Sequence, residues 1–319
     1  MRPYIFVILL GFIETIIFAL VFLPILRKLK LGQNIRVDGP KRHLGKAGTP
    51  TMGGIIFLIP LLINSLIFGY KDTDTLMVLS ITLGFGLIGF LDDFLKIVFK
   101  RSLGLKANQK ILGQLVFSTL LAYYMFAVKG SSELYLPFIN GYIDLGWFYI
   151  PFTVFVIIAT VNSVNLTDGL DGLVTGITII VVLAFGLMFE KMGMKNIVVF
   201  SSSLIGVCLG FLMFNKHPAK VFMGDTGSLA LGGAIVALAV VTKTQLFIPI
   251  IGMIFVFESL SVILQVLFFR FTGKRIFRMS PIHHHFELMG WSEYTVVKTF
   301  WMFTVITAIV GLIGFKKIF

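Results

Sequence analysis

Long apolar runs separated by short polar stretches dominate the chain. Each run is close to the ~20 residues that an α-helix needs to cross the ~30 Å hydrocarbon core of a bilayer. We therefore expect an all-α integral membrane protein, a bundle of ten transmembrane helices that forms one polytopic domain over residues 1–319. The ten runs cover residues 4–26, 52–70, 76–99, 110–128, 147–165, 172–190, 196–214, 228–242, 246–269 and 294–315.

The first run, 4–26, could be mistaken for a secretory signal peptide. It is longer than the apolar region of a signal peptide and carries no small-residue cleavage site. It is followed directly by Arg27, Lys28 and Lys30, which are typical of the flank of a membrane-spanning segment. We expect it to be a helix of the mature chain.

The distribution of Lys and Arg predicts the orientation in the membrane. Four loops, at 27–51, 96–110, 215–227 and 270–293, carry 18 of the 27 basic residues. Because positively charged loops stay in the cytoplasm, we expect these four loops to be cytoplasmic. An even number of spans then leaves both termini outside.

Composition narrows the function further. The chain is 57% hydrophobic and 13% charged, with a net charge of +12 and a mean hydropathy of +0.97. The basic loops suit membrane topology and anionic lipid headgroups, whereas nucleic acid is not an expected partner because no aromatic platform accompanies the charge. The only cysteine, Cys208, lies in an apolar run, so no intrachain disulfide is possible.

Carboxylates at the edges of the apolar runs point to a functional site. Acidic residues near a bilayer are tolerated when they face protein, water or metal. In the predicted orientation the following five aspartates, like all five histidines, lie on the cytoplasmic side, which indicates one metal-competent site assembled from several loops. These aspartates are Asp92, Asp93, Asp168, Asp171 and Asp225.

The adjacent pair Asp92 and Asp93 ends the third run in the stretch GFLDDFLK. Neighbouring helical residues point about 100° apart, so the two cannot clamp one ion symmetrically. One of them can bind metal or a proton while the other is held by a neighbour such as Lys96. The alternative is a hydrated helix end, but carboxylates there oppose the helix dipole, which favours a function.

The stretch VNSVNLTDGLDG places Asn162, Asn165, Asp168 and Asp171 at steps of three. Such a row forms a polar strip at the end of the fifth run. It carries amides and carboxylates without a basic residue, which suits a nucleobase or sugar hydroxyls. The alternative is capping of the next helix by Asp168 or Asp171, which explains one residue of the four.

The stretch NKHPAKVFMGDTGS leads into the eighth run. Gly224 and Gly227 free the backbone around Asp225, at a helix N-terminus of the kind that binds anions. Asp225 can cap this helix or hold a Mg²⁺ ion that bridges an anion. The neighbouring Lys216 and Lys220 favour a phosphate.

Two further motifs lie in the predicted cytoplasmic loops. The stretch GTPTMGG, 48–54, follows Lys46 and could donate backbone N–H groups to phosphate; it lacks the P-loop pattern, so a plain loop is favoured. In PIHHHFELMGW the side chains of His283, His284 and His285 diverge, so their roles are expected to be divided among substrate contact, proton handling and packing.

In the ninth run, Glu258, Ser261 and Gln265 share one helix face. Interhelical hydrogen bonds explain them at least as well as catalysis does.

Two classes of protein compete on these residues. One is a membrane enzyme that acts on a phosphorylated substrate with Mg²⁺, and the other is a secondary transporter. A transporter places its ionisable groups near the midplane of the membrane, on broken helices. Here they gather at one face, beside glycine-rich loops and basic residues, which favours the enzyme.

At this point the motifs resemble a known family. The stretches GTPTMGG, GFLDDFLK, NLTDGLDGL, FNKHPAKVFMGDTGSLALGG and PIHHHFELMGW occur in this order along the chain. Together they resemble phospho-N-acetylmuramoyl-pentapeptide-transferases, within the polyprenyl-phosphate sugar-1-phosphate transferases. The nearest alternative in that superfamily transfers N-acetylglucosamine-1-phosphate.

The resemblance implies a reaction between UDP-N-acetylmuramoyl-pentapeptide and undecaprenyl phosphate. The products would be UMP and undecaprenyl-pyrophosphoryl-N-acetylmuramoyl-pentapeptide, known as lipid I. It also implies a requirement for Mg²⁺, a multi-pass protein of the bacterial cytoplasmic membrane, a homodimer and an active site on the cytoplasmic face.

The resemblance also implies roles for individual residues. Asp225 would be the metal ligand, Phe222 would stack on uracil, and Lys46 and Lys110 would contact phosphates. Asn165, Asp168 and Asn215 would surround the nucleotide. The expected catalytic residues are Asp92, Asp93, Asp225, His283, His284 and His285, and the expected substrate-binding residues are Lys46, Thr51, Lys96, Lys110, Asn162, Asn165, Asp168, Asp171, Asn215 and Phe222.

Overall fold

The computed structural model describes residues 2–28, 46, 48–69, 72–99, 104–139 and 141–315. Nine helices in these ranges are long and apolar enough to cross a membrane, so the chain is an all-α membrane protein. The nine lie in α1 (Arg2–Lys28), α3 (Thr73–Val98), α4 (Ala107–Tyr123, continued by a π-helical turn, Tyr124–Val128), α5 (Tyr149–Thr167), α6 (Leu173–Lys191), α7 (Lys195–Asn215), α8 (Gly224–Val241), α10 (Met253–Thr272) and α12 (Glu293–Gly314).

Two of the predicted runs differ from the expectation. The run 52–70 forms α2 (Gly54–Gly69), an apolar helix of 16 residues, so the count of ten spans stays a prediction. The run 246–269 was expected to be one helix and is instead divided into α9 (Ile248–Ile251) and α10. The division falls at Gly252, which has non-helical backbone angles and packs close to the ring of Phe255.

A small β-hairpin, which was not predicted from the sequence, accompanies the helices. Strands β1 (Glu133–Leu136) and β2 (Gly141–Asp144) pair antiparallel, with Glu133 opposite Asp144. The buried Tyr135 packs against Phe247 and Phe315, and the amide of Phe138 donates to the carbonyl of Gly314. The hairpin is therefore held in place by contacts with distant parts of the chain. Such contacts cannot be predicted from the sequence of two four-residue strands.

Helix α8 lies at the centre of the bundle. In its apolar window 89% of the residues are buried, against 22% in α1 and 28% in α10. Small residues allow its neighbours to approach closely, as is common between membrane helices: a Cβ on Gly54 would lie 2.3 Å from Gly227, and one on Gly89 would lie 2.0 Å from the carbonyl oxygen of Asp225. The start of α8 is thus wedged between α2 and α3.

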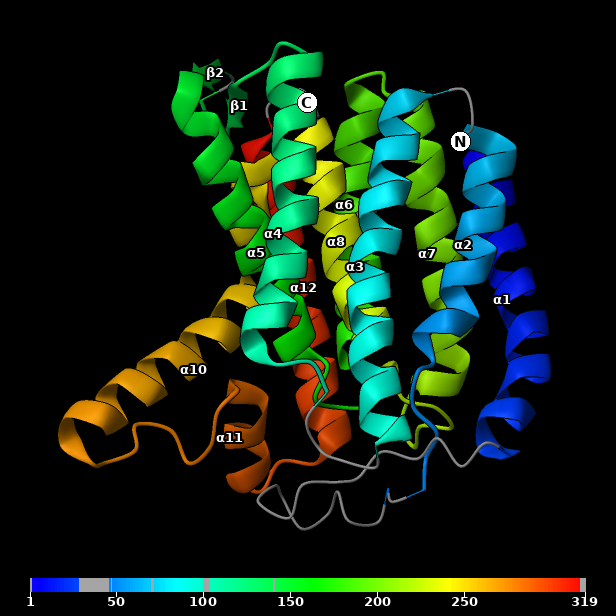
Figure 1. Cartoon of the computed structure of the whole chain (residues 1–319), viewed down its shortest axis with the longest axis vertical. Coiled ribbons are helices and arrows are strands. Elements are labelled where there is room, and N and C mark those ends of the chain that lie inside the picture. The colour runs from blue at the N-terminus through cyan, green and yellow to red at the C-terminus, as the bar shows by residue number, and fades with distance from the viewer. Residues whose placement is uncertain are drawn as a thin grey trace.

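The helices run alternately up and down the bundle (Figure 1). The N-terminus of α1 and the end of α12 lie at the same end as the β-hairpin. The start of α2, the end of α3, the turn between α5 and α6, the start of α8 and the short helix α11 (Ile282–Leu288) lie at the opposite end. The aspartate motifs therefore share one end of the bundle, while α10 projects sideways from it.

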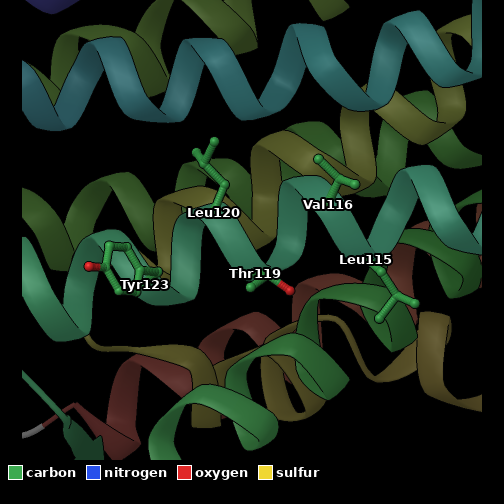
Figure 2. A pocket seen from close by; sticks show the side chains of 5 residues that line it. All are labelled: Leu115, Val116, Thr119, Leu120 and Tyr123. Atoms are coloured by element: carbon green, nitrogen blue, oxygen red, sulfur yellow. The ribbon is translucent and has the colours of Figure 1, made fainter.

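A shallow groove of 530 Å³ lies on the outer side of α4, and the side chains that line it all come from this one helix (Figure 2). Four of the five are exposed large hydrophobic or aromatic side chains, as expected of a surface that faces lipid. The lining of the groove is mostly apolar, unlike the polar end of the bundle. Its lining residues are Leu115, Val116, Thr119, Leu120 and Tyr123.

We expect Gly89→Ala to lower the melting temperature of the purified protein and to reduce its activity. The new Cβ would meet the backbone of Asp225, and overpacking of this kind typically costs about 1–3 kcal/mol. Gly186→Ala is the matched control, because a Cβ there would make only an ordinary 3.7 Å contact with Ser201. Equal melting temperatures for the two variants would contradict the close approach of α3 and α8.

Candidate active site at one end of the bundle

Three carboxylates from two helices meet at the polar end of the bundle. Asp92 and Asp93 lie near the end of α3, and Asp225 lies in the first turn of α8. Each offers an oxygen, and these oxygens lie within 4.8 Å of one another. The sequence predicted that these motifs would come together, and the structure brings these three into one cluster.

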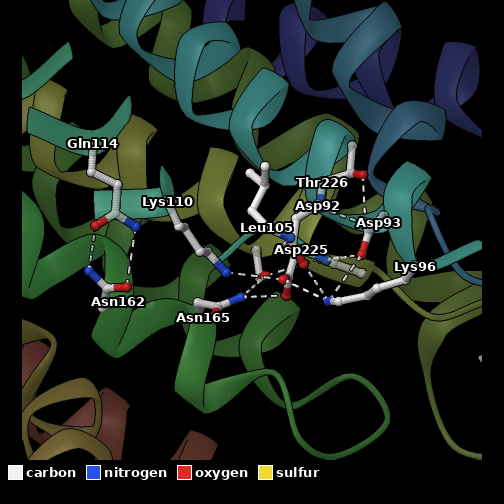
Figure 3. A network of polar contacts seen from close by, with 12 residues as sticks. Asp92, Asp93, Lys96, Leu105, Lys110, Gln114, Asn162, Asn165, Asp225 and Thr226 are labelled. Atoms are coloured by element: carbon white, nitrogen blue, oxygen red, sulfur yellow. Dashed lines mark hydrogen bonds and ion pairs between the residues drawn. The ribbon is translucent and has the colours of Figure 1, made fainter. Parts of the chain in front are cut away.

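Asp225 is the centre of the polar network in Figure 3. Its Oδ2 accepts from Nζ of Lys96 and Nζ of Lys110, each at 3.0 Å, and its Oδ1 accepts from Nδ2 of Asn165 at 2.9 Å. The side chain of Asp225 is 20% exposed, whereas those of Asp92 and Asp93 are 5% exposed. Asp225 is therefore the carboxylate that an incoming ligand meets.

Asp92 connects α3 to the segment that leads into α4. Its Oδ2 pairs with Nζ of Lys96 at 2.5 Å, one helical turn away, and its Oδ1 accepts from the amide of Leu105 at 2.9 Å. A Cβ on Gly104 would lie 2.5 Å from the carbonyl oxygen of Asp92, so glycine is needed for this approach. Lys96 is shared between Asp92 and Asp225, as the sequence argument for a neighbouring counter-ion expected.

Asp93 caps helix α8 from a different helix. Its Oδ2 accepts from the amide of Thr226 at 2.9 Å and from the Thr226 hydroxyl at 2.7 Å, and its Oδ1 accepts from the amide of Asp225 at 3.2 Å. The first backbone N–H groups of a helix have no acceptor within the helix. The carboxylate oxygens of Asp93 provide acceptors for two of them. The alternative that Asp225 caps its own helix is therefore wrong; the cap comes from α3.

The polar strip at the end of α5 and in the turn that follows it is divided among different partners. Asn162 exchanges two hydrogen bonds with Gln114 of α4, at 2.8 and 3.2 Å, so it joins two helices. Asn165 donates to Asp225 and also to the hydroxyl of Ser228. The alternative that Asp168 or Asp171 caps α6 is wrong, because the N-cap is Gly172, with φ of +77° and no side-chain cap.

Asp168 lies in the turn between α5 and α6, beside the carboxylate cluster. Burial, together with the negative charges of Asp225, Asp93 and Asp171, raises the pKa of Asp168 well above its ordinary value. A protonated carboxyl can donate a hydrogen bond. Asp168 is thus suited to meet an acceptor oxygen of a ligand when it is protonated, and a cation at the cluster would shift it back towards the charged form.

A second polar cluster lies around Asp171. Its Oδ1 accepts from Nζ of Lys46 at 2.7 Å, and its Oδ2 accepts from the amide of Ala219 at 3.0 Å and lies 3.1 Å from Nδ1 of His217. Glu293 of α12 accepts from Lys46 at 2.6 Å and from the amide of Asp171 at 2.7 Å. Asp171, His217 and Glu293 also satisfy the spacing of a metal-binding group, but among the described residues Lys46 already supplies a cation there.

The two glycine-rich loops pair with each other. The amides of Gly53 and Gly54 donate to the carbonyls of Phe222 and Met223 at 2.9 Å, and the amide of Phe222 donates to the carbonyl of Pro50 at 2.8 Å. These N–H groups are therefore not available to phosphate, which confirms the plain-loop interpretation of GTPTMGG for Gly53 and Gly54. Thr51 is buried beside Gly224.

Asn215 holds the loop that carries Phe222. Its Oδ1 accepts from the hydroxyl of Thr175 at 2.9 Å, and its Nδ2 donates to the carbonyl of Val221 at 3.1 Å. Asn215 is 3% exposed, whereas Phe222 is only partly buried. Asn215 therefore holds the loop in its conformation, whereas the side chain of Phe222 is partly accessible on the surface of that loop.

The three adjacent histidines have different surroundings. His283 is fully buried, with Nδ1 3.0 Å from Glu258, and a Cβ on Gly169 would lie 2.1 Å from its Nε2. His284 bonds Glu287 at 2.8 Å. His285 accepts from the amide of Arg278 at 3.1 Å. The three side chains diverge as expected, and His283 packs against the turn that carries Asp168, while the roles of the three histidines stay a prediction. The fifth histidine, His43, lies outside the described residues.

On the face of α10 formed by Glu258, Ser261 and Gln265, the first and the last bond other segments, whereas the Ser261 hydroxyl donates to the carbonyl of Glu258 in its own helix. Glu258 contacts His283, and Gln265 accepts from the amides of Ile276 and Phe277 at 3.0 Å. These contacts hold the segment leading to α11 against α10.

The three-carboxylate cluster fits a hard divalent cation. Such ions prefer carboxylate oxygens, and three carboxylates held this close need compensating positive charge. In this structure Lys96 and Lys110 provide it. Because Asp93 is occupied by the amides of α8, Asp225 and Asp92 are the better candidates for contact with a metal.

Glu293, Gln114 and the pairing of His217 were not predicted from the sequence. Glu293 follows the N-cap Ser292 at the start of α12. An acidic residue there is common because it complements the helix dipole, so nothing in the sequence sets it apart. Gln114 lies one helical turn after Lys110 in α4. This spacing is the only sequence feature that places the two side chains on the same face of the helix.

Residues 75–243 match the model of glycosyl transferase family 4, which covers α3 to α8 and the carboxylate cluster. Residues 46–58 match the model described as phospho-N-acetylmuramoyl-pentapeptide-transferase signature 1, which covers Lys46 and the loop paired with Phe222. The chain is thus a membrane protein that matches glycosyl transferase family 4.

Relatives across nearly the whole chain narrow the class. A phospho-N-acetylmuramoyl-pentapeptide-transferase from Caldanaerobacter subterraneus subsp. tengcongensis is 53% identical over 97% of this chain and 98% of its own length. Proteins of the same name from Desulforamulus reducens and Halalkalibacterium halodurans are 51% and 48% identical, over 96% and 98% of this chain and 93% and 97% of their own lengths. The chain belongs to the phospho-N-acetylmuramoyl-pentapeptide-transferase family.

We expect Asp93→Ala to lower both the melting temperature and the activity, since it leaves buried N–H groups of α8 without a partner, at a cost of about 1–3 kcal/mol. Asp72→Ala is the matched control, because Asp72 bonds the amide and hydroxyl of Thr75 in the same way at the other end of α3. This control should lose stability but keep its turnover at a temperature where it remains folded. Full activity of Asp93→Ala would show that the cap does not position Asp225.

Proposed function

We propose that the chain transfers phospho-N-acetylmuramoyl-pentapeptide from its UDP donor to undecaprenyl phosphate, giving lipid I and UMP. The observation that carries this proposal is the convergence of Asp92, Asp93 and Asp225 with Lys96 and Lys110 at one end of the bundle. Family membership supports it, since relatives that match over almost their whole length carry the name of this activity.

The chemistry needs positioning and charge neutralisation more than covalent help from the protein. An oxygen of the lipid phosphate attacks the β-phosphorus of the donor, and a new P–O bond forms. The bond between that phosphorus and the bridging oxygen breaks, and UMP leaves with the electron pair. A phosphate monoester loses its second proton near pH 6, so Asp92 has at most one weakly held proton to accept.

Lys96 and Lys110 are placed to meet the phosphates. Both already contact Asp225 at 3.0 Å, and both side chains are partly exposed. A pyrophosphate that reaches this point would exchange contacts with these two ammonium groups. Their positive charge would also stabilise the leaving phosphate, which is the usual role of Lys in phosphoryl transfer.

Mg²⁺ is the cofactor we propose. Asp225, with Asp92 beside it, would hold it, and when bound the ion neutralises charge on the pyrophosphate. Asp93 has a different role in this proposal, because its oxygens are used by the first turn of α8. It positions Asp225 rather than binding the metal.

The donor nucleotide would lie next to this cluster. Phe222 is the partly buried aromatic side chain we propose for stacking on uracil, with Asn215 shaping its loop. Asp168 and Lys46 would border the nucleotide from the turn after α5 and the loop before α2. The two partly buried histidines, His284 and His285, would face the large sugar-peptide part of the donor.

The proposed setting is the bacterial cytoplasmic membrane, with a homodimer as the functional unit. The polar end of the bundle would face the cytoplasm, where the nucleotide donor is soluble, and both termini would lie outside. The basic loops support this orientation by the positive-inside rule. The polyprenyl acceptor would arrive sideways from the lipid.

Removal of divalent metal is expected to stop turnover. Excess chelator should abolish UMP release by the purified protein, and Mg²⁺ or Mn²⁺ should restore it. Asp225→Asn should lower the rate by ~10³ or more, the scale seen when a main electrostatic group is removed, while the melting temperature changes little because a crowded negative charge is lost. Full turnover in chelator would overturn the metal proposal.

Donor choice separates this proposal from transfer of N-acetylglucosamine-1-phosphate. We expect UMP release from UDP-N-acetylmuramoyl-pentapeptide and almost none from UDP-N-acetylglucosamine in side-by-side assays. His284→Ala and His285→Ala should each lower turnover by at least ~10² while the protein remains folded and responsive to Mg²⁺. If UDP-N-acetylglucosamine proves the better donor, the assigned substrate is wrong.

Cysteine labelling tests the orientation. In a Cys208→Ser background, Lys274→Cys between α10 and α11 should resist an impermeant thiol reagent applied to intact cells. Asn196→Cys at the start of α7 should react. Both positions are exposed and lie at opposite ends of the bundle, so the comparison is matched, and the reverse pattern would place the carboxylate cluster outside the cell.

A further inference from the structure

Glu293 is a partly buried carboxylate that belongs to none of the recognised motifs. It lies in the first turn of α12, just after Ser292, which caps the helix by accepting from the amide of Thr295 at 3.1 Å. Because Ser292 supplies the cap, Glu293 is not needed for it. Its side chain is only 11% exposed and is turned into the protein.

Glu293 contacts three separate segments of the site. Its Oε1 accepts from Nζ of Lys46 at 2.6 Å and from the amide of Asp171 at 2.7 Å, and its Oε2 lies 3.4 Å from Nδ1 of His217. These partners come from the loop before α2, the turn between α5 and α6, and the loop between α7 and α8. In the proposed function the same three segments carry the groups that border the donor nucleotide.

Lys46 is the partner whose position depends most on Glu293. Its ammonium group lies between Asp171, at 2.7 Å, and Glu293, at 2.6 Å, and its side chain is 17% exposed. An ammonium group has three N–H donors, so two carboxylates use two of them and leave one. A long lysine side chain has many rotamers, and the second carboxylate removes most of that freedom.

We propose that Glu293 is a positioning residue for the donor nucleotide, acting through Lys46 and the turn that carries Asp171. This inference rests on the proposed function and goes beyond it by assigning a residue of α12 to donor binding. Glu293 does not touch the donor itself. It fixes the remaining N–H of Lys46 in the direction of the site and joins the three nucleotide-bordering segments to one another.

The kinetic signature of this role is a selective effect on one substrate. Glu293→Ala should raise the KM for the UDP donor about tenfold, while kcat and the KM for undecaprenyl phosphate change by less than about threefold. Equilibrium binding of UMP should weaken by a similar factor. Glu293→Gln keeps an acceptor oxygen for Lys46 and for the amide of Asp171, so its effect should be smaller than that of alanine.

Glu133→Ala is the matched control. Glu133 pairs with Lys243 at 2.8 Å, in an ion pair of the same type at the opposite end of the bundle. This variant should keep the wild-type KM for both substrates. If Glu293→Ala does not fold, Glu293→Gln provides the same comparison.

A double-mutant cycle tests the route through Lys46. Lys46→Met alone should raise the KM for the donor, and adding Glu293→Ala to it should raise that KM little further, since residues that act through one contact are not additive. Additive effects, an unchanged donor KM in both Glu293 variants, or an equal loss for both substrates would each overturn the inference. If the wild-type protein releases no UMP, it is the proposed function that fails.

Discussion

The rest of the site depends on the hydrogen bonds between Asp93 and the start of α8. Three donors of the first turn converge on this one carboxylate: the amide of Asp225 itself, and the amide and hydroxyl of Thr226. In a membrane bundle, where water is scarce, an uncapped helix end is costly. The cap therefore fixes α3 against α8, and the absence of a side chain at Gly89 permits the close contact. Asp225 is held in place as a consequence.

Compensation of charge explains the arrangement around that cap. Buried carboxylates are stable when they are paired and hydrogen-bonded, and this end of the bundle supplies partners from several segments. Lys96 and Lys110 serve the three-carboxylate cluster, and Lys46 serves Asp171 and Glu293. The two clusters use the same principle in adjacent places. One has oxygens and cations suited to a pyrophosphate and its metal, and the other holds together the loops that border a nucleotide.

Much of this was predictable from sequence because the signals are local. Apolar length predicts spans, basic loops predict that the aspartate motifs share an end, and adjacent helical residues predict different roles for Asp92 and Asp93. What could not be predicted depends on pairing between distant segments. Glu293 lies 247 residues from Lys46, and the break at Gly252 and the hairpin around Tyr135 are likewise set by packing. The partners of the histidines, such as Glu258 for His283, are also set by packing between separate segments.

The difference between Asp92 and Asp93 follows from helix geometry. Consecutive residues of an α-helix point about 100° apart, so one of the two faces the first turn of α8 while the other faces Lys96 and the segment before α4. Asp93 is not free to exchange partners, because two backbone amides and the Thr226 hydroxyl of the first turn of α8 already occupy its oxygens. Asp92 can exchange its partner, because that partner is Lys96, a flexible side chain that can leave a carboxylate for a phosphate. A pair of identical side chains thus supplies one structural and one exchangeable carboxylate, and their order along α3 is what places the exchangeable one beside Asp225.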